Sequence, residues 1–284
     1  MKKFLAIFAS AVMMMSCLTG CGAAGSSSQE AKPANKLEAI KSSGKLVVGT
    51  SPDFVPMEFE DISSGKKEYV GADIELAKYI AKELGVELEI KAMEFMAIQQ
   101  AVASDVVDLG IAGFAATPKR AEAMNLSDNY NIDRKTDSQH GVLVLKEDAA
   151  KYNSPESFSG KKVAAQNASL QQTLVEKNLP KDVELKPIAS IPEGVLMLKT
   201  GKVDAIALAM DNADNFIEAN PELAKAEYVF PYVAEGNVVA MKKGETELLE
   251  EINKVIADIN ESGIFNTWKE EATALAKKLN IKMD

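Results

Sequence analysis

Arg120 lies three residues after Thr117, at the start of a predicted helix, which is an unusual place for a cation. Thr117 is a favourable N-cap residue and Pro118 suits the first helical position. A cation in the first turn opposes the helix dipole, so helix propensity does not explain it. A guanidinium beside free backbone N–H groups can bind a carboxylate through paired hydrogen bonds. The pattern indicates a carboxylate-binding site, with a solvated surface arginine as the alternative.

The segment before this helix predicts how Arg120 is positioned. Residues 109–112 form a short apolar run that contains Gly110 and is followed by Gly113, which is typical of a buried strand in a parallel sheet. Ligands of open α/β sheets bind at the carboxyl ends of the strands. We therefore expect Gly113, Ala115 and Arg120 to lie beside a ligand.

Few other residues could carry chemistry. His140 is the single histidine, and Cys17 and Cys21 are the two cysteines. A lone histidine beside a strand is usually a hydrogen-bonded neighbour, and a metal site or a Ser/His or Cys/His relay needs partners that the sequence does not supply. No glycine fingerprint of a dinucleotide site follows a predicted strand. The sequence predicts no metal, no cofactor and no catalytic residue.

Length and charge bound the possible functions. The chain has 284 residues, 46% of them hydrophobic, which is enough for two lobes with buried cores. Its formal net charge of -10 disfavours binding to nucleic acid, because phosphate backbones require a basic face.

The N-terminal residues predict export. Lys2 and Lys3 precede an apolar stretch over residues 4–15, which is too short for a spanning helix and is typical of a signal peptide. Residues 18–21 read Leu-Thr-Gly-Cys and resemble a bacterial lipobox, which implies cleavage before Cys21 and lipidation of its thiol; an ordinary signal peptide is the alternative. We expect a signal peptide over residues 1–20 and a flexible Gly/Ser/Ala-rich tether over residues 21–36.

Alternating strand and helix patterns predict a doubly wound α/β fold. The expected strands are 45–49, 86–90, 106–112, 141–146, 163–166 and 203–208. The expected helices are 73–84, a helix ending at 103, 170–178, 192–198, 211–219, 245–259 and a final helix after Gly263.

Residues 113–120, GFAATPKR, and the following NLSDNY resemble the signature of the polar amino-acid substrate-binding proteins of ABC importers. The resemblance covers nearly the whole mature chain. It implies that Arg120 holds the α-carboxylate of the ligand and that Gly113 and Ala115 line the pocket. It also implies a type 2 periplasmic binding protein fold with two lobes joined by a two-strand hinge.

The same resemblance extends to other segments. It places Phe54 and Phe95 on the aromatic walls of the pocket, although either ring could instead belong to a core. It places Ser169, Leu170 and Gln171 at a helix end that faces the ligand carboxylate. Ala209 stands where the family has an aspartate that pairs with the ligand amine. Asp211 and Glu58 are the alternatives for that role.

The resemblance implies an organisation and a function. Residues 37–138 and 234–284 would form one lobe and residues 139–233 the other, with a small-molecule ligand, expected to be an amino acid or related carboxylate, in the cleft. The partners would be an ABC permease and its ATPase, with a lipid anchor holding a monomer at the outer face of the membrane or in the periplasm. A dehydratase of the arogenate or prephenate type on the same fold, or a lipoprotein sensor or adhesin, are the alternatives.

Overall fold

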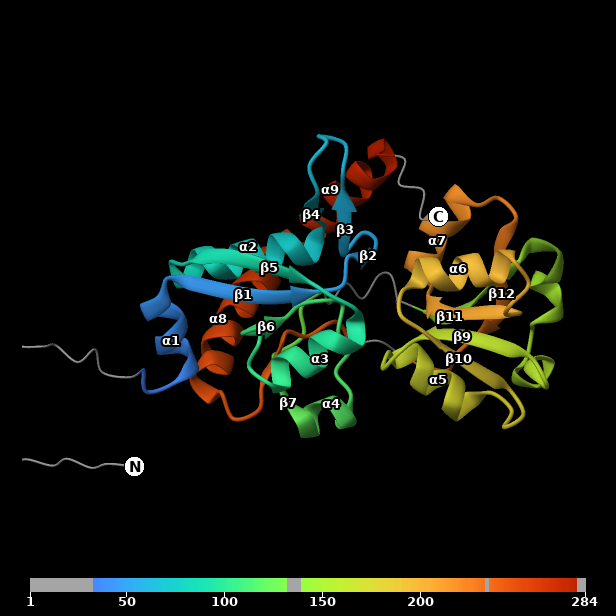
Figure 1. Ribbon diagram of the computed structural model, residues 1–284, viewed down its shortest axis with the longest axis horizontal. Helices are drawn as coiled ribbons and strands as arrows, with labels where there is room; N and C mark the ends of the chain where they lie inside the picture. The colour runs from blue at the N-terminus through green and yellow to red at the C-terminus, as the bar shows by residue number, and fades with distance from the viewer. Residues whose placement is uncertain (1–32, 132–138, 233–234, 280–284) are drawn as a thin grey trace, which may run out of the picture. The chain divides into compact units, whose positions relative to one another are not determined.

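The computed structural model describes residues 33–131, 139–232 and 235–279 (Figure 1). The predicted signal peptide, Cys21 and most of the predicted tether lie outside the described residues. Within these ranges, no helix combines the length and the apolar character that crossing a membrane requires.

The first of two five-stranded sheets joins strands from both ends of the chain. Its strands, in spatial order, are β5 (Glu87–Ala92), β1 (Lys45–Thr50), β6 (Leu109–Gly110), β13 (Ala240–Lys242) and β7 (Met124–Leu126). β1 runs parallel to β5 and β6, whereas β13 is antiparallel to β6 and β7. The carboxyl end of β6 therefore leads directly into the Gly113–Arg120 segment.

Helices cover both faces of the first sheet. They are α1 (Lys36–Ser43), α2 (Ala72–Leu84), α3 (Phe95–Ala103), α4 (Pro118–Ala123), α8 (Thr246–Ser262) and α9 (Ile264–Leu279). Leu46 and Val48 pack with α1, α2 and α8, while Val47 packs with α3. This alternation along β1 buries an apolar layer on each face, because successive side chains of a strand point in opposite directions.

A small antiparallel sheet follows β1. It consists of β2 (Asp53–Phe54), β3 (Glu58–Asp61) and β4 (Glu68–Val70). The sequence predicted only an extended loop over residues 50–59, since Pro52 and Pro56 exclude a helix. The pairing adds a fixed position for Phe54, whose ring packs on apolar residues of two core clusters.

The second sheet lies in residues 140–229, called the second region below; the other described residues form the first region. Its strands, in spatial order, are β10 (Glu184–Ile188), β9 (Lys162–Gln166), β11 (Ala205–Ala209), β8 (His140–Leu145) and β12 (Leu223–Val229). α6 (Ile191–Lys199) and α7 (Met210–Ala219) pack on one face, and α5 (Leu170–Asn178) packs on the other. Two short 3-10 helices, Lys146–Lys151 and Pro155–Phe158, connect β8 to β9.

The structure confirms the helices that carry strong local signals. Ile74, Ile80 and Leu84 form the buried stripe of α2, and Gly85 ends the helix with φ of 70° in the left-handed region. Several elements have no counterpart in the predictions, among them α1, β10 and β12. α1 has a single buried residue, Ile40, and β10 and β12 mix charged with apolar residues, so their hydrophobic patterns are weak.

Candidate functional site

Arg120 is a buried cation held at the start of α4. Thr117 is the N-cap, its Oγ1 accepts a hydrogen bond from the Arg120 N–H at 3.3 Å, and Pro118 opens the helix as predicted. The Arg120 side chain folds back into the protein, so that only 5% of the residue is exposed. The alternative of a solvated surface arginine is therefore wrong.

The guanidinium of Arg120 contacts only neutral groups among the described residues. Nη1 donates to the carbonyl of Ala115 at 2.8 Å, and Nη2 donates to the carbonyl of Ala168 at 3.0 Å. The Arg120 Cζ atom lies 5.2 Å and 5.1 Å from the ring centroids of Phe95 and Phe114. No carboxylate of the described residues lies within ion-pair distance. Burial lowers the pKa of Arg120 to about 10, so the side chain remains a cation at neutral pH.

The N-terminus of α5 supplies unsatisfied donors close to Arg120. The Oγ of Ser169 accepts from the Gln172 N–H at 3.0 Å, which makes Ser169 the predicted N-cap. The N–H groups of Leu170 and Gln171 have no acceptor among the described residues, as expected in the first turn of a helix. Ala168 immediately precedes this end with φ of 59°, and its carbonyl contacts Arg120. The buried cation and the helix N-terminus thus meet at one point.

Gly113 adopts a conformation that suits glycine, with φ of 56°. A Cβ atom there would lie 2.8 Å from Cε1 of Phe54, so the ring of Phe54 rests directly on the Gly113 backbone. The Gly113 N–H donates to Oδ2 of Asp73 at 2.7 Å, and its carbonyl accepts from Nδ2 of Asn237 at 2.8 Å. These contacts fix the peptide that the sequence predicts at the ligand site.

A cluster of buried acids lies behind Gly113. Oδ2 of Asp73 also accepts from the Tyr130 hydroxyl at 3.0 Å, and Asp73, Tyr130 and Glu58 are each at most 1% exposed. Burial, followed by the neighbouring charge of Asp73, raises the pKa of Glu58 well above its ordinary value. Burial also raises the pKa of Asp73 to about 6, although the hydrogen bond from Gly113 opposes the rise. Glu58 is therefore a fully buried carboxyl group beside Asp73, whose raised pKa favours the neutral form, and it is a poor partner for a ligand amine.

Asp211, the other candidate for the amine, lies in the first turn of α7. Its Oδ1 accepts from the Asn212 N–H at 2.9 Å, and its Oδ2 lies 3.6 Å from the ammonium of Lys269. Its side chain is 37% exposed. Ala209 is the N-cap residue of the same helix and carries no polar side chain.

The structure places the predicted site residues in two groups. Gly113, Ala115, Arg120, Ser169 and Leu170 lie at or beside the meeting point of Arg120 and α5. Phe54 rests on Gly113, and Phe95 packs against Phe114 with centroids 4.8 Å apart beneath Arg120. The side chains of Gln171 and Asp211 contact other residues: Nε2 of Gln171 lies 3.0 Å from Nδ1 of His140, and Asp211 pairs with Lys269, whereas the backbone N–H of Gln171 stays at the N-terminus of α5.

Other residues near this point carried no recognisable signal in the sequence. Ala168 contributes a backbone carbonyl, Phe114 contributes a ring face, and the Tyr232 phenol, neutral at pH 7, is close enough for its ionised form to raise the pKa of Arg120. His140 is 7% exposed and contacts the ring of Tyr232 and the side-chain amide of Gln171. These contacts agree with the prediction that His140 is a hydrogen-bonded neighbour of a strand. Within the described ranges, no group of three or more His, Cys, Asp or Glu residues has the arrangement of a metal site.

Comparisons with known proteins identify the family of the chain. The sequence profile of the bacterial extracellular solute-binding proteins, family 3, matches residues 46–274. The arginine-binding extracellular protein ArtP of Bacillus subtilis (strain 168) is 28% identical over 279 residues, covering 95% of this chain and 98% of that protein. The glutamine-binding protein GlnH of the same organism is 28% identical over 284 residues, covering 96% of this chain and 100% of that protein.

Solved structures give the same result for the fold. The substrate-binding protein AbpA of Streptococcus pneumoniae, bound to L-arginine, is 38% identical, with a TM-score of 0.78, and the match covers 86% of this chain and 99% of that one. Arginine-bound ArgBP of T. maritima, as its Gly52Ala mutant, is 32% identical, with a TM-score of 0.71 and coverage of 79% and 100%. The fold is that of the type 2 periplasmic binding proteins, as expected.

These matches decide between the predicted functions. The family consists of extracellular solute-binding proteins, which favours the transport function over the dehydratase alternative. The protein is not an enzyme, and its place is the periplasm or the cell surface. The chain belongs to the bacterial extracellular solute-binding proteins, family 3.

Proposed function

We propose that this chain is the amino-acid-binding component of an ABC importer and that Arg120 holds the α-carboxylate of its ligand. The observation that carries the proposal is the buried guanidinium, which has two carbonyl partners and two aromatic faces but no anion among the described residues. A buried charge without a counter-ion is costly, so its retention points to a ligand that supplies the negative charge.

The N-terminus of α5 completes the anion site. The Leu170 and Gln171 N–H groups point out of the first turn of this nine-residue helix, and the helix dipole favours a negative charge there. Arg120 belongs to the first region and α5 to the second, so a bound carboxylate stabilises the contact between them. The ligand thereby favours the closed conformation through its differential affinity.

The two predicted aromatic walls take different roles in this proposal. Phe54 is partly exposed and rests on Gly113, where its ring can cover the apolar part of a ligand. Phe95 is 7% exposed and packs with Phe114, so it supports the Arg120 guanidinium from below. The core alternative that the sequence left open for Phe95 is consistent with this supporting role.

L-arginine is the first ligand to test. ArtP is named as arginine-binding, and AbpA and ArgBP are described with arginine bound, whereas other relatives are named for glutamine, histidine or cystine. Residue 209 is alanine and supplies no carboxylate for the ligand amine, so Asp211, two residues later and 37% exposed, is the candidate for that role.

A thermal-shift screen of the amino acids tests the ligand. A ligand that binds only the native state increases the free energy of unfolding by mass action, by about 2.7 kcal/mol at a ligand concentration of 100 Kd. The melting temperature rises as a result. We expect L-arginine or another polar amino acid to give the largest rise. If no amino acid shifts the melting temperature at millimolar concentration, the proposed ligand class is wrong.

The finer organisation follows the sequence expectations. The chain acts as a monomer that delivers its ligand to a permease driven by an ATPase. Residues 37–138 and 234–284 form one lobe, and residues 139–233 form the other.

A lipid on Cys21 anchors the protein to the membrane. Replacing Cys21 with Ala is expected to release the protein from the membrane fraction, and an unchanged membrane fraction would exclude the anchor.

A further inference from the structure

The carboxylate of Asp53 bridges the first and second regions. Its Oδ2 accepts hydrogen bonds from Nε2 of Gln166 at 2.9 Å and from the Ile191 N–H at 3.0 Å. Its Oδ1 accepts from the Ser51 hydroxyl at 2.9 Å within the first region. Gln166 ends β9 and Ile191 begins α6, so one side chain of β2 binds two elements of the second region.

The contact with α6 is chemically favourable. Ser190 is the N-cap of this nine-residue helix, and its hydroxyl accepts from the Glu193 N–H, which leaves the Ile191 N–H free for another acceptor. A carboxylate at a helix N-terminus benefits from both the hydrogen bond and the helix dipole. Burial raises the pKa of Asp53, while the hydrogen bonds from Ile191 and Ser51 oppose that rise.

A second pair of hydrogen bonds reinforces this bridge two residues later. The carbonyl of Val55 accepts from Nδ2 of Asn212 at 3.0 Å and from Nδ2 of Asn215 at 3.1 Å. Both asparagines belong to α7, and Val55 is 2% exposed. The segment of residues 53–55 therefore receives four hydrogen bonds from β9, α6 and α7, none of which involves Arg120 or the N-terminus of α5.

Phe54 lies between the two bridging residues and faces Gly113. The bridge therefore holds the Phe54 ring at the proposed ligand site. The Asp53 carboxylate and the Val55 carbonyl on either side of this ring accept the hydrogen bonds from the second region. Such a segment can stabilise the closed conformation without changing which ligand the protein prefers.

We propose that Asp53 is a positioning residue for closure, whose carboxylate binds the N-terminus of α6 and Gln166 when the two regions come together. The proposal rests on the proposed function, since closure is the step that retains the ligand. The hydrogen bonds of Asp53 stabilise the closed conformation by the same amount whichever ligand is bound. They act after the encounter with the ligand, so they govern its dissociation and leave its association unchanged.

The test replaces Asp53 with Ala in the mature protein and measures two quantities. Small-angle scattering of the ligand-free protein reports the open and closed populations, and stopped-flow fluorescence with L-arginine reports the association and dissociation rates. We expect a larger radius of gyration in Asp53→Ala and a dissociation rate about 10- to 100-fold faster, from the loss of two hydrogen bonds to a charged acceptor. The association rate should change by less than about 3-fold.

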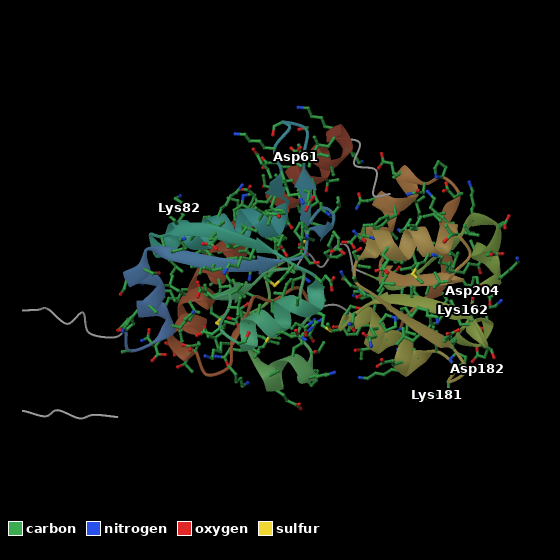
Figure 2. All side chains as sticks on the ribbon, viewed as in Figure 1. Asp61, Lys82, Lys162, Lys181, Asp182 and Asp204 are labelled. Carbon is green, nitrogen blue, oxygen red and sulfur yellow. The ribbon has the colours of Figure 1, made fainter. Side chains whose placement is uncertain are left out.

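Asp61→Ala is the matched control, because Asp61 belongs to the neighbouring strand β3. Figure 2 shows Asp61 on the β3–β4 hairpin, and its Oδ1 accepts from the Ser63 N–H within that hairpin. Gln166→Ala approaches the same bridge from the second region and provides a second variant if Asp53→Ala folds poorly. The double variant should show less than the sum of the two single effects, because both remove one contact.

Three outcomes decide the proposal. If Asp53→Ala and Gln166→Ala both open the ligand-free protein and accelerate dissociation, the closure role is supported. If both behave like Asp61→Ala in scattering and in dissociation, the closure role is wrong. If the wild type binds no amino acid, the proposed function fails, yet scattering of the ligand-free variants still decides whether Asp53 holds the regions together.

Discussion

Two buried clusters contact the two ends of the Gly113–Arg120 segment, one at Gly113 and one at Arg120, and their charged groups are satisfied in different ways. At one, the Arg120 guanidinium has carbonyl and aromatic neighbours but no anion among the described residues. At the other, the carboxylate of Asp73 accepts hydrogen bonds from Gly113 and Tyr130, while burial and the charge of Asp73 raise the pKa of Glu58. The first cluster lacks an opposite charge among the described residues, whereas the raised pKa values in the second favour a neutral carboxyl group.

The difference separates a ligand site from its support. A charge that the fold neutralises itself contributes to one conformation, and here it holds the Gly113 peptide in place. A buried cation without a counter-ion lowers the stability of the folded protein, and a bound anionic ligand restores that stability. Similar burial thus has opposite meanings on the two sides of one segment.

The largest effect is expected from breaking the cationic side. Arg120→Ala should weaken amino-acid binding by about 30- to 5,000-fold, because truncating one partner of a buried charge pair costs about 2–5 kcal/mol. Calorimetric titration measures the change. Lys119→Ala is the control, since Lys119 is the adjacent exposed cation. Equal affinities in the two variants would show that the guanidinium does not contact the ligand.

The acidic side is tested by pH. A carboxyl group whose pKa is raised in the folded state stabilises the fold at low pH, and that contribution is lost as the pH rises from the unfolded pKa through the folded one. For Asp73 this window runs from about 4 to about 6, and for Glu58 it begins at the ordinary glutamate pKa and extends well above it. We therefore expect the contribution of this pair to the free energy of unfolding to be smaller at pH 8 than at pH 5.

Glu58→Gln should flatten this dependence, because the amide cannot ionise. Urea unfolding of the variant and the wild type at pH 5 and pH 8 measures it, with Glu60→Gln as the control on the same strand. At pH 8 the variant should be the more stable by about 1 kcal/mol or more, since the amide needs neither to take up a proton on folding nor to bury a charge. The same pH dependence in the wild type and in Glu58→Gln would exclude the proton-holding role.

The smallest effect is expected at the helix end that faces Arg120. Ser169→Ala removes the N-cap of α5 and should cost about 1 kcal/mol in the free energy of unfolding. Asn35→Ala removes the corresponding cap of α1, whose Oδ1 accepts from the Glu38 N–H at 2.9 Å. Both variants should lose similar stability, but only Ser169→Ala should also weaken ligand binding, by a few-fold. A loss of binding in both would indicate a general effect of stability.

The helix starts of the site could be predicted from the sequence because their signals are local. Thr117 and Ser169 are N-caps within three residues of the groups they bind, and both are confirmed. The partners of Arg120 could not be predicted, since the Ala168 carbonyl is 48 residues away and depends on a left-handed φ. The bridge at Asp53 likewise joins residues 138 positions apart along the chain.

Charge patterns alone misplaced one acid. Glu58 follows a proline-rich loop and looked available to a ligand amine, but β3 turns it into the interior beside Asp73. The edge strands β10 and β12 were missed because alternating charges hide their apolar faces. Positions that depend on contacts between distant segments thus remain outside local sequence rules.

The most direct test of the central claim compares L-arginine with agmatine, which is arginine without its carboxylate, by titration of the wild type and of Arg120→Ala. If another amino acid is the ligand, its own decarboxylated amine takes the place of agmatine. We predict that the wild type prefers the amino acid by at least about 100-fold and that Arg120→Ala loses most of this preference. Equal preference in the wild type and in Arg120→Ala would contradict the claim that Arg120 awaits a carboxylate.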